Sequence, residues 1–300
     1  LRPGTMRDLR LDPADLLAVN ERLVYCAVTG WGQDGPYADR PALDIIVQGQ
    51  SGLMSVTGEA DGAPVKVGVS ISDLTAGLYG TIAILAALAA RVRDRKGQLV
   101  DISMFESSVA LAVWEAGQYF TTGEVPRAFG SAHKLIAPYQ AIRASDGHFI
   151  VGATTPPNWT SFCAALGLEH LERDQRFADG TVRRKNVEAL IPLIEEITAT
   201  RPMSHWLALL RGAGVPCGEI ADYGATFTDP HLAERGFFTE LDHTRLGKVR
   251  GLGSPLRLAR TPVRLERAGP LLGEHSREIL RESGYSDAEI DRLVAEGTVA

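Results

Sequence analysis

The feature that most constrains the fold is a long apolar helix pattern between two stretches that favour β structure. Residues 73–92 form this pattern, and their middle, Ile82 to Ala90, is apolar on nearly every side, which predicts a buried helix. Leu23 to Thr29 is a continuous apolar run, typical of a strand covered on both faces. Gln98 to Met104 alternates in polarity and is predicted to be a second strand. Strand, helix and strand in this order predict a βαβ-type layer.

A second compact part follows a loop-like stretch. Thr121 to His133 is rich in glycine, proline and polar residues and is predicted to be a linker. Beyond it, Ser145-Asp146-Gly147 lies between two apolar runs and predicts a β-hairpin. Asp12-Pro13 is a helix start signal. Further helices are predicted at residues 9–20, 43–54, 157–167, 181–199, 202–213, 274–283 and 286–296, with polar strands after residue 235.

Composition excludes several classes of protein. Of 300 residues, 45% are hydrophobic and 23% are charged, as in globular rather than disordered proteins. A net charge of -6 without a basic stripe argues against nucleic-acid binding. The longest apolar run, Thr81 to Ala90, is shorter than the ~18 to 20 residues of a membrane span, so we expect no membrane association. Cys26, Cys163 and Cys217 are widely spaced, so we expect buried free thiols and a reducing, cytoplasmic location.

Two frequent kinds of site are not supported by the motifs. Gly30 to Gly35 matches GxGxxG after a predicted strand, but Pro36 and Pro41 follow where a dinucleotide site needs a helix start. We therefore expect a tight loop that can line a site, and no nicotinamide or flavin cofactor. The seven histidines do not pair at i,i+4 or adjoin carboxylate clusters, and no GxSxG elbow exists. We expect no metal centre and no hydrolase of that type.

Among the carboxylates of the chain, Asp73 has the position that points most clearly to a possible catalytic role. It lies where a strand or loop, Val67 to Ser72, meets the predicted apolar helix. Asp is among the best helix N-caps, which gives it a purely structural interpretation. A helix N-terminus also stabilises an ionised carboxylate, and an ionised carboxylate can act as a nucleophile. The local pattern leaves both interpretations open.

Four segments resemble the class III (CaiB/BaiF) CoA-transferases, which have the α-methylacyl-CoA racemases as relatives. Arg2 to Met6 resembles the end of the family's N-F-x-P-G motif. Leu23 to Gly58 and Asp73 to Met104 are similar to the family's long central motifs. Pro270 to His275 resembles its C-terminal P-x-L-G-E-H. Since the chain starts inside the first of these motifs, at Leu1 and without an initiator Met, we expect that its natural N-terminus is missing.

The resemblance implies a covalent role for Asp73, with capping as a compatible second role. The family's catalytic aspartate stands at the start of the signature helix, which corresponds to Asp73. Its carboxylate would attack an acyl-CoA thioester to give a mixed anhydride, and CoA would then pass through the enzyme to a second carboxylic acid. Backbone amides of a glycine-containing loop would stabilise the oxyanions. The implied partners are an acyl-CoA and a small carboxylic acid, and no cofactor is needed besides the CoA thioester itself.

Two alternatives remain beside CoA transfer. Racemisation needs general bases on both faces of the α-carbon, and the racemases carry His and Glu where this chain has Leu43 and Thr155. Leucine cannot accept a proton and threonine is a very weak base, so a racemase or epimerase is disfavoured. A CoA-binding protein without catalysis is the other alternative. The glycine-rich lid of formyl-CoA transferases is not evident between Gly117 and Pro138, which argues against oxalate or formate as substrates.

The resemblance also implies CoA contacts, a fold and an assembly. The predicted CoA-binding residues are Leu1, Arg2, Arg40, Pro41, Ala42, Leu43 and Asp44, and the two arginines are candidates to meet phosphates. The predicted fold is α/β: a Rossmann-like large domain takes residues 1–125 and 235–300, and a smaller α+β domain takes residues 136–234. The family forms interlocked dimers, so we expect a homodimer.

Overall fold

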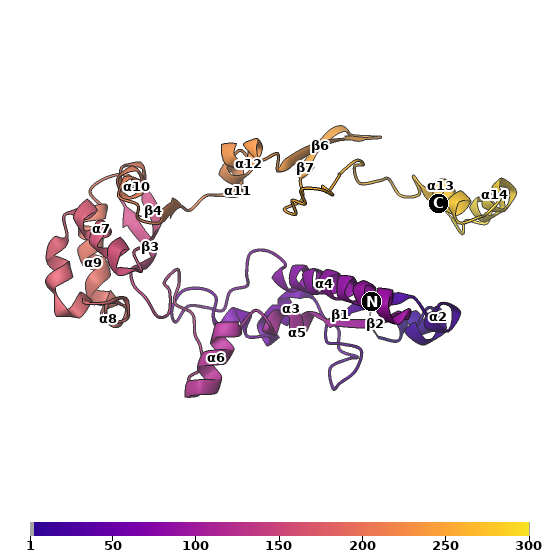
Figure 1. Ribbon diagram of the computed structural model, residues 1–300, viewed down its shortest axis with the longest axis horizontal. Coiled ribbons are helices and arrows are strands. Elements are labelled where there is room, and N and C mark those ends of the chain that lie inside the picture. Colours follow the sequence, from indigo (N-terminus) through magenta and orange to yellow (C-terminus); the bar gives the residue numbers. More distant parts are fainter. Residues whose placement is uncertain (1–2, 300) are drawn as a thin grey trace. The chain divides into compact units, whose positions relative to one another are not determined.

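The computed structural model describes residues 3–299 and separates into two units by its contacts, Leu1–Glu219 and Ile220–Ala300 (Figure 1). The first part of unit one contains α1 (Thr5–Asp8), α2 (Pro13–Val19), β1 (Val24–Thr29), α3 (Asp44–Gln50), the 3-10 turn η1 (Leu53–Ser55), α4 (Ile71–Asp94), β2 (Gln98–Ser103), α5 (Met104–Val109) and α6 (Val113–Thr122). The predicted linker indeed has no regular structure from Gly123 to Ala132.

The predicted βαβ unit is confirmed. β1 and β2 pair in parallel from Val24 opposite Gln98 to Thr29 opposite Ser103, and α4 forms the crossover between them. Gly80 faces the strand pair, where a Cβ would lie 3.8 Å from Cys26 Sγ, an ordinary contact distance. The start signal of α2 is also confirmed, because the Asp12 carboxylate accepts from two first-turn N–H groups.

The prediction that α4 is buried all round is wrong for the described structure. Its buried residues are Ser72, Thr75, Ala76, Gly80 and Ala87. A second face, with Leu74, Leu78, Ile82 and Leu85, stays exposed, and Leu78 is 66% accessible. Apolar character can be predicted from the sequence, whereas burial also requires an element packed on each face. Here α4 packs on β1, β2, α3 and α5.

The length of α4 also bears on the membrane expectation. The helix has 24 residues and is long and apolar enough to cross a bilayer by length and composition. It extends well beyond the apolar run from which we excluded a span. Core helices of soluble proteins share this composition, and α4 is a crossover helix of a parallel strand pair. The absence of membrane association therefore stays a prediction.

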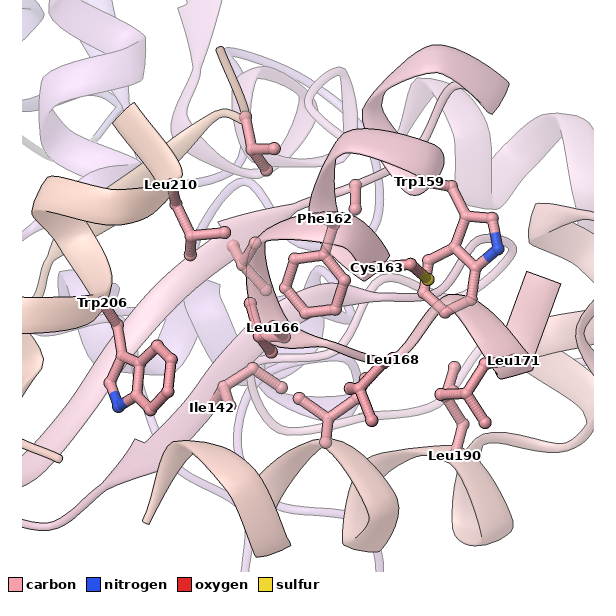
Figure 2. Close-up of a cluster of buried hydrophobic side chains, with 14 of the residues drawn as sticks. Ile142, Trp159, Phe162, Cys163, Leu166, Leu168, Leu171, Leu190, Trp206 and Leu210 are labelled. Carbon is pink, nitrogen blue, oxygen red and sulfur yellow. The ribbon is translucent and has the colours of Figure 1, made fainter. Parts of the chain in front are cut away.

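A separate core organises the second part of unit one (Figure 2). Its elements are β3 (Tyr139–Ala144), β4 (Gly147–Gly152), α7 (Pro156–Leu166), η2 (Glu169–Arg173), η3 (Gln175–Phe177), α8 (Gly180–Lys185), α9 (Val187–Thr198), α10 (Met203–Gly212) and β5 (Cys217–Glu219). The predicted hairpin is confirmed as β3–β4, with β5 antiparallel to β4. Phe162 lies at the centre of the cluster, between Trp159 and Trp206 in Figure 2, and is fully buried.

The single helix predicted for residues 181–199 is interrupted. α8 ends at Lys185, and α9 begins at Val187. The Asn186 side-chain amide donates to the Arg176 carbonyl at 3.1 Å and to the Val182 carbonyl at 3.0 Å. Asn competes for backbone partners in this way, which is why it disfavours helix interiors. A periodicity that continues across such a residue therefore overestimates the helix.

Unit two contains α11 (Tyr223–Thr226), α12 (Pro230–Glu234), β6 (Phe238–His243), β7 (Gly247–Leu252), α13 (Ser276–Glu282) and α14 (Asp287–Ala295). The strands predicted after residue 235 are confirmed as the antiparallel pair β6–β7, and both C-terminal helices are present. α14 begins with a capping box between Ser286 and Glu289. The predicted return of residues 235–300 to the large domain stays a prediction, as do the other domain boundaries.

Arg183 is a buried cation that stabilises the second core of unit one. Its side chain is 2% exposed, and its guanidinium lies over the Trp159 ring at 4.3 Å from the ring centroid. Nε donates to the Ala137 carbonyl at 2.7 Å and Nη1 to the Phe177 carbonyl at 3.0 Å. Burial lowers the Arg183 pKa, which expresses the cost of removing this charge from water. The two carbonyls therefore depend on one side chain for their partners.

Replacing Arg183 with Ala should destabilise unit one strongly, because it leaves two carbonyls without their donor and a hole beside Trp159. We expect a loss of about 2–5 kcal/mol in the free energy of unfolding, since each buried acceptor left without a donor costs about 1–3 kcal/mol. Urea denaturation followed by tryptophan fluorescence measures it. Lys185→Ala, an exposed change on the same helix, should stay within about 0.5 kcal/mol of the wild type. Equal effects of the two changes would contradict this role.

Candidate active site

Asp73 is the third residue of α4 and is not its cap. The helix begins at Ile71, so Ser70 is the N-cap residue, and the Ser70 side chain makes no capping hydrogen bond. The predicted capping role of Asp73 is therefore wrong. The Asp73 carboxylate is exposed and accepts no hydrogen bond from any residue between 3 and 299. An unengaged carboxylate on the first turn of a helix is available to an incoming ligand.

The residue before Asp73 is held from two sides. The Ser72 N–H donates to Asp44 Oδ1 at 3.0 Å, which links α4 to α3. The Ser72 and Ser108 hydroxyls lie 2.9 Å apart in a buried hydrogen bond, which links α4 to α5. Both serine residues are fully buried. The backbone beneath Asp73 is therefore fixed although its carboxylate is free.

A buried amide completes this network. Gln48 is fully buried on α3, and its Nε2 donates to Asp44 Oδ2 at 2.7 Å. Its Oε1 accepts from the Val67 N–H at 2.9 Å, in the segment that leads into α4. Sequence reasoning missed Gln48, Ser72 and Ser108 as site residues. The available signal was a glutamine four residues after Asp44 within an apolar stretch, which places both side chains on one helix face.

The surroundings of Asp73 raise the pKa of its carboxyl group. Partial burial is the larger cause and the negative charge of Asp44 is the second. Both disfavour the ionised form, whereas the N-terminal end of α4 favours it. A carboxylate with a raised pKa is a stronger base and a stronger nucleophile than an ordinary aspartate.

The structure brings one of the predicted CoA contacts to Asp73. Asp44 reaches Ser72, whereas the Arg40 guanidinium lies over the Tyr37 ring, 3.7 Å from its centroid. Pro41 and Ala42 lead into α3, and Leu43 is its N-cap residue, 69% exposed. Leu1 and Arg2 lie outside the described residues. The CoA-binding roles of all seven residues stay predictions.

The loop after β1, from Gly30 onward, is stabilised by its own hydrogen bonds and is not followed directly by a helix, as a dinucleotide-binding turn would be. The Gly32 N–H donates to Thr29 Oγ1 at 2.9 Å, and the Gln33 N–H donates to Asp101 Oδ2 at 3.0 Å. Trp31 is buried against Phe105, with ring centroids 5.5 Å apart. No helix begins between the end of β1 at Thr29 and Asp44. Two of the loop amides are thus engaged within the protein, and the absence of a nicotinamide or flavin cofactor stays a prediction.

A cavity of about 310 Å³ opens beside this end of β1. Its lining includes Pro3, Gly4 and Met6 from the N-terminal segment and Thr29 and Gln33 from β1 and the following loop. These segments belong to the motifs on which the family resemblance rests. Among residues 3–299, no group of three His, Cys, Asp or Glu side chains is arranged to hold a metal ion.

The free cysteines differ in their burial. Cys163 is buried, and desolvation raises its pKa to about 12. Cys26 and Cys217 are half-buried, and burial raises their pKa values as well. All three are therefore poor thiolates and weak candidates for a nucleophile. The buried-thiol expectation is confirmed fully only for Cys163.

Comparison with known proteins gives consistent results. The sequence model of CoA-transferase family III matches residues 1–276. The chain is 34% identical over 300 residues to an acyl-CoA transferase of Fusarium pseudograminearum, covering 99% of this chain and 66% of that protein. It is 32% identical over 298 residues to the succinyl-CoA:glutarate CoA-transferase of Mus musculus, with coverages of 99% and 68%. The chain thus spans about two thirds of the length of these relatives.

Other similarities agree. The chain is 33% identical over 290 residues to the acetyl-CoA:oxalate CoA-transferase of Acetobacter aceti, covering 96% of this chain and 73% of that protein. A crystal structure of a CaiB/BaiF family protein from Brucella suis matches with a TM-score of 0.82 and 37% identity, covering 94% of this chain and 73% of that one. This match confirms the predicted α/β fold class.

Replacing Asp44 with Asn should lower the pKa of Asp73. The change removes the charge that raises this pKa but keeps an oxygen that can accept the Ser72 N–H. A carbon NMR titration of the side-chain carboxyl groups measures the shift. Asp94→Asn, at the other end of α4, is the control and should leave the Asp73 titration unchanged. An unaltered Asp73 pKa in Asp44→Asn would show that the two carboxylates do not interact.

Proposed function

The chain belongs to CoA-transferase family III, and from this premise we propose that it moves CoA from an acyl-CoA thioester to a carboxylic acid through a covalent intermediate on Asp73. The observation that carries the proposal is the free, exposed carboxylate of Asp73 on a first turn fixed by Asp44 and Ser108. A nucleophile must meet its substrate in one defined direction, and a fixed backbone limits the directions that its side chain can take.

The reaction consists of four exchanges between oxygen and sulfur. An Asp73 oxygen attacks the thioester carbonyl, the C–S bond breaks, and a mixed anhydride and the CoA thiolate result. The thiolate attacks the Asp73 carbonyl of the anhydride, giving an aspartyl-CoA thioester and releasing the first acid as its carboxylate. The second acid's carboxylate then attacks this thioester and again expels the thiolate. The thiolate attacks the new acyl group, releasing the new acyl-CoA and the Asp73 carboxylate.

These exchanges suit the groups around Asp73. Electrons balance without a redox partner, because each step replaces one acyl leaving group by another. A raised pKa makes the Asp73 carboxylate a better nucleophile toward the thioester. The oxyanion of each tetrahedral intermediate needs N–H donors, which we assign to main-chain amides near the first turn of α4 or in a glycine-containing loop.

For the substrates, we propose a succinyl-CoA donor and a dicarboxylic acid acceptor. The support is in the names of relatives: succinyl-CoA:glutarate CoA-transferases of Mus musculus and Homo sapiens, and a succinyl-CoA:mesaconate enzyme of Haloarcula hispanica. The relative from Acetobacter aceti is named for oxalate, so the predicted exclusion of oxalate stays a prediction. A cytoplasmic homodimer is part of the same proposal.

Substitution of Asp73 tests the covalent step. Asp73→Asn and Asp73→Ala should each lower the transfer rate by about 1,000-fold or more, because no nucleophile replaces the carboxylate. The assay mixes succinyl-CoA with a panel of carboxylic acids, including oxalate, and separates the CoA esters by chromatography. Hydroxylamine added with the donor should leave a hydroxamate on the peptide that contains Asp73, found by mass spectrometry.

The control for this experiment is Asp94→Asn on the same helix, which should transfer CoA at the wild-type rate. Wild-type transfer by Asp73→Ala would overturn the mechanism. Binding of acyl-CoA without any trapped adduct or transfer would instead support the non-catalytic alternative.

Racemisation remains the rival reaction. The two positions where racemases carry His and Glu, here Leu43 and Thr155, lie at the starts of two helices. Leu43 precedes α3 as its N-cap residue, and Thr155 Oγ1 accepts the Asn158 N–H at the start of α7. Neither side chain is a competent base. Incubation of a 2-methylacyl-CoA in deuterated water without an acceptor acid should therefore give no deuterium at the α-carbon by mass spectrometry. Incorporation at a rate comparable to CoA transfer would favour the racemase.

A further inference from the structure

Gln48 is a fully buried side chain near Asp73, and both polar atoms of its amide make hydrogen bonds. Its Nε2 donates to Asp44 Oδ2 at 2.7 Å and makes a longer contact of 3.4 Å to the Val69 carbonyl. Its Oε1 accepts from the Val67 N–H at 2.9 Å. One amide on α3 therefore connects to a carboxylate on the same helix and to the segment that enters α4.

The orientation of this amide is fixed by its partners. The Val67 N–H can only donate, and an ionised Asp44 carboxylate can only accept. The Gln48 amide oxygen must therefore face the Val67 N–H, and the amide nitrogen must face Asp44. A flipped amide would place oxygen against oxygen and N–H against N–H. Asp44 in turn has Oδ2 held by Gln48 and Oδ1 held by the Ser72 N–H. Asp44 thus cannot rotate toward solvent without leaving a buried donor unpaired.

We propose that Gln48 is a positioning residue for the acyl exchange, acting through Asp44 to set the first turn of α4 and hence the direction in which Asp73 presents its carboxylate. This inference rests on the proposed function of Asp73. Gln48 is fully buried, so it contributes by orienting Asp44 and the segment that enters α4. A nucleophile displaced by about 1 Å can lose roughly 100-fold in rate, which makes such support measurable.

The charged groups on the neighbouring elements are few. α3 contacts α4, α5 and η1. Near this end, α4 carries Asp73 and α5 carries Glu106, whereas η1 has no charged residue. Lys66 adjoins Val67, but its Nζ donates to the Val67 carbonyl. Asp44 is the charge that bonds to the Gln48 amide nitrogen. A variant that titrates at position 48 therefore acts first on Asp44.

Gln48→Glu is the sharpest test because its effect depends on pH. A protonated Glu has the shape of Gln, can donate its O–H to Asp44 and can accept from Val67. Once ionised, it has no proton to donate and repels Asp44. The variant should approach wild-type kcat at low pH and lose roughly 10-fold to 100-fold as pH rises, with KM for the acyl-CoA little changed. The wild type should lack this basic limb.

The controls separate positioning from a general loss of structure. Gln50→Glu adds the same charge at an exposed position of α3 and should keep the wild-type profile. Gln48→Met keeps the approximate volume without polar atoms, so it should lower kcat at every pH while circular dichroism shows a folded protein. If Gln48→Glu does not fold, Gln48→Met decides: a folded variant with wild-type kcat overturns the proposal.

The outcomes also distinguish this inference from the proposed function. If Asp73→Ala retains activity, the covalent mechanism itself is wrong. If Asp73→Ala is inactive but folded Gln48→Glu has the wild-type pH profile, only the positioning role is wrong. A uniform loss in Gln48→Glu at all pH values, with an unchanged profile, would show a merely structural role and would also overturn it.

Discussion

The parallel pairing of β1 with β2 is the constraint on which the site depends. Two parallel strands need a crossover, and a crossover helix runs back against the strand direction, so the first turn of α4 lies at the carboxyl edge of the pair. The loop after β1 and the start of α5 after β2 reach the same edge, where the Phe105 N–H donates to the Gly30 carbonyl at 3.0 Å. In open α/β sheets this edge is where ligands bind. The strand topology therefore places Asp73, on the first turn of α4, at the carboxyl edge of the strand pair.

At that edge, two carboxylates have opposite surroundings and therefore different roles. Asp44 accepts hydrogen bonds at both oxygens, from Ser72 and Gln48, and is thereby held in one orientation. Asp73 is exposed, and no residue between 3 and 299 donates to its carboxylate, while partial desolvation and, second, the charge of Asp44 raise its pKa. The two carboxylates therefore differ in their contacts: Asp44 supports the backbone, and Asp73 is open to a ligand. The destabilised member is the one free to react.

The fold could be predicted further from the sequence than the site could. Periodicity and cap chemistry are local, so β1, α4, β2 and the cap at Asp12 followed directly from the residues. The choice of Ser70 rather than Asp73 as the N-cap residue depended on where the entering segment is held, which is a tertiary contact. Gln48 was missed for the same reason, since its partner Val67 is 19 residues away. The family resemblance identified Asp73, and local chemistry alone left its role open.

The exposed face of α4 shows which contacts determine the direction of Asp73. Ala76 is fully buried, and a Cβ at Gly80 would lie within 4 Å of side chains on both β1 and β2, so α4 faces the strands with small residues. Leu74 and Leu78 are exposed, so neither side chain fixes the first turn. The polar contacts of Ser72 with Asp44 and Ser108 remain as the interactions that fix the rotation of the turn. The reactive carboxylate is thus oriented by hydrogen bonds, and Gln48 holds the acceptor of one of them.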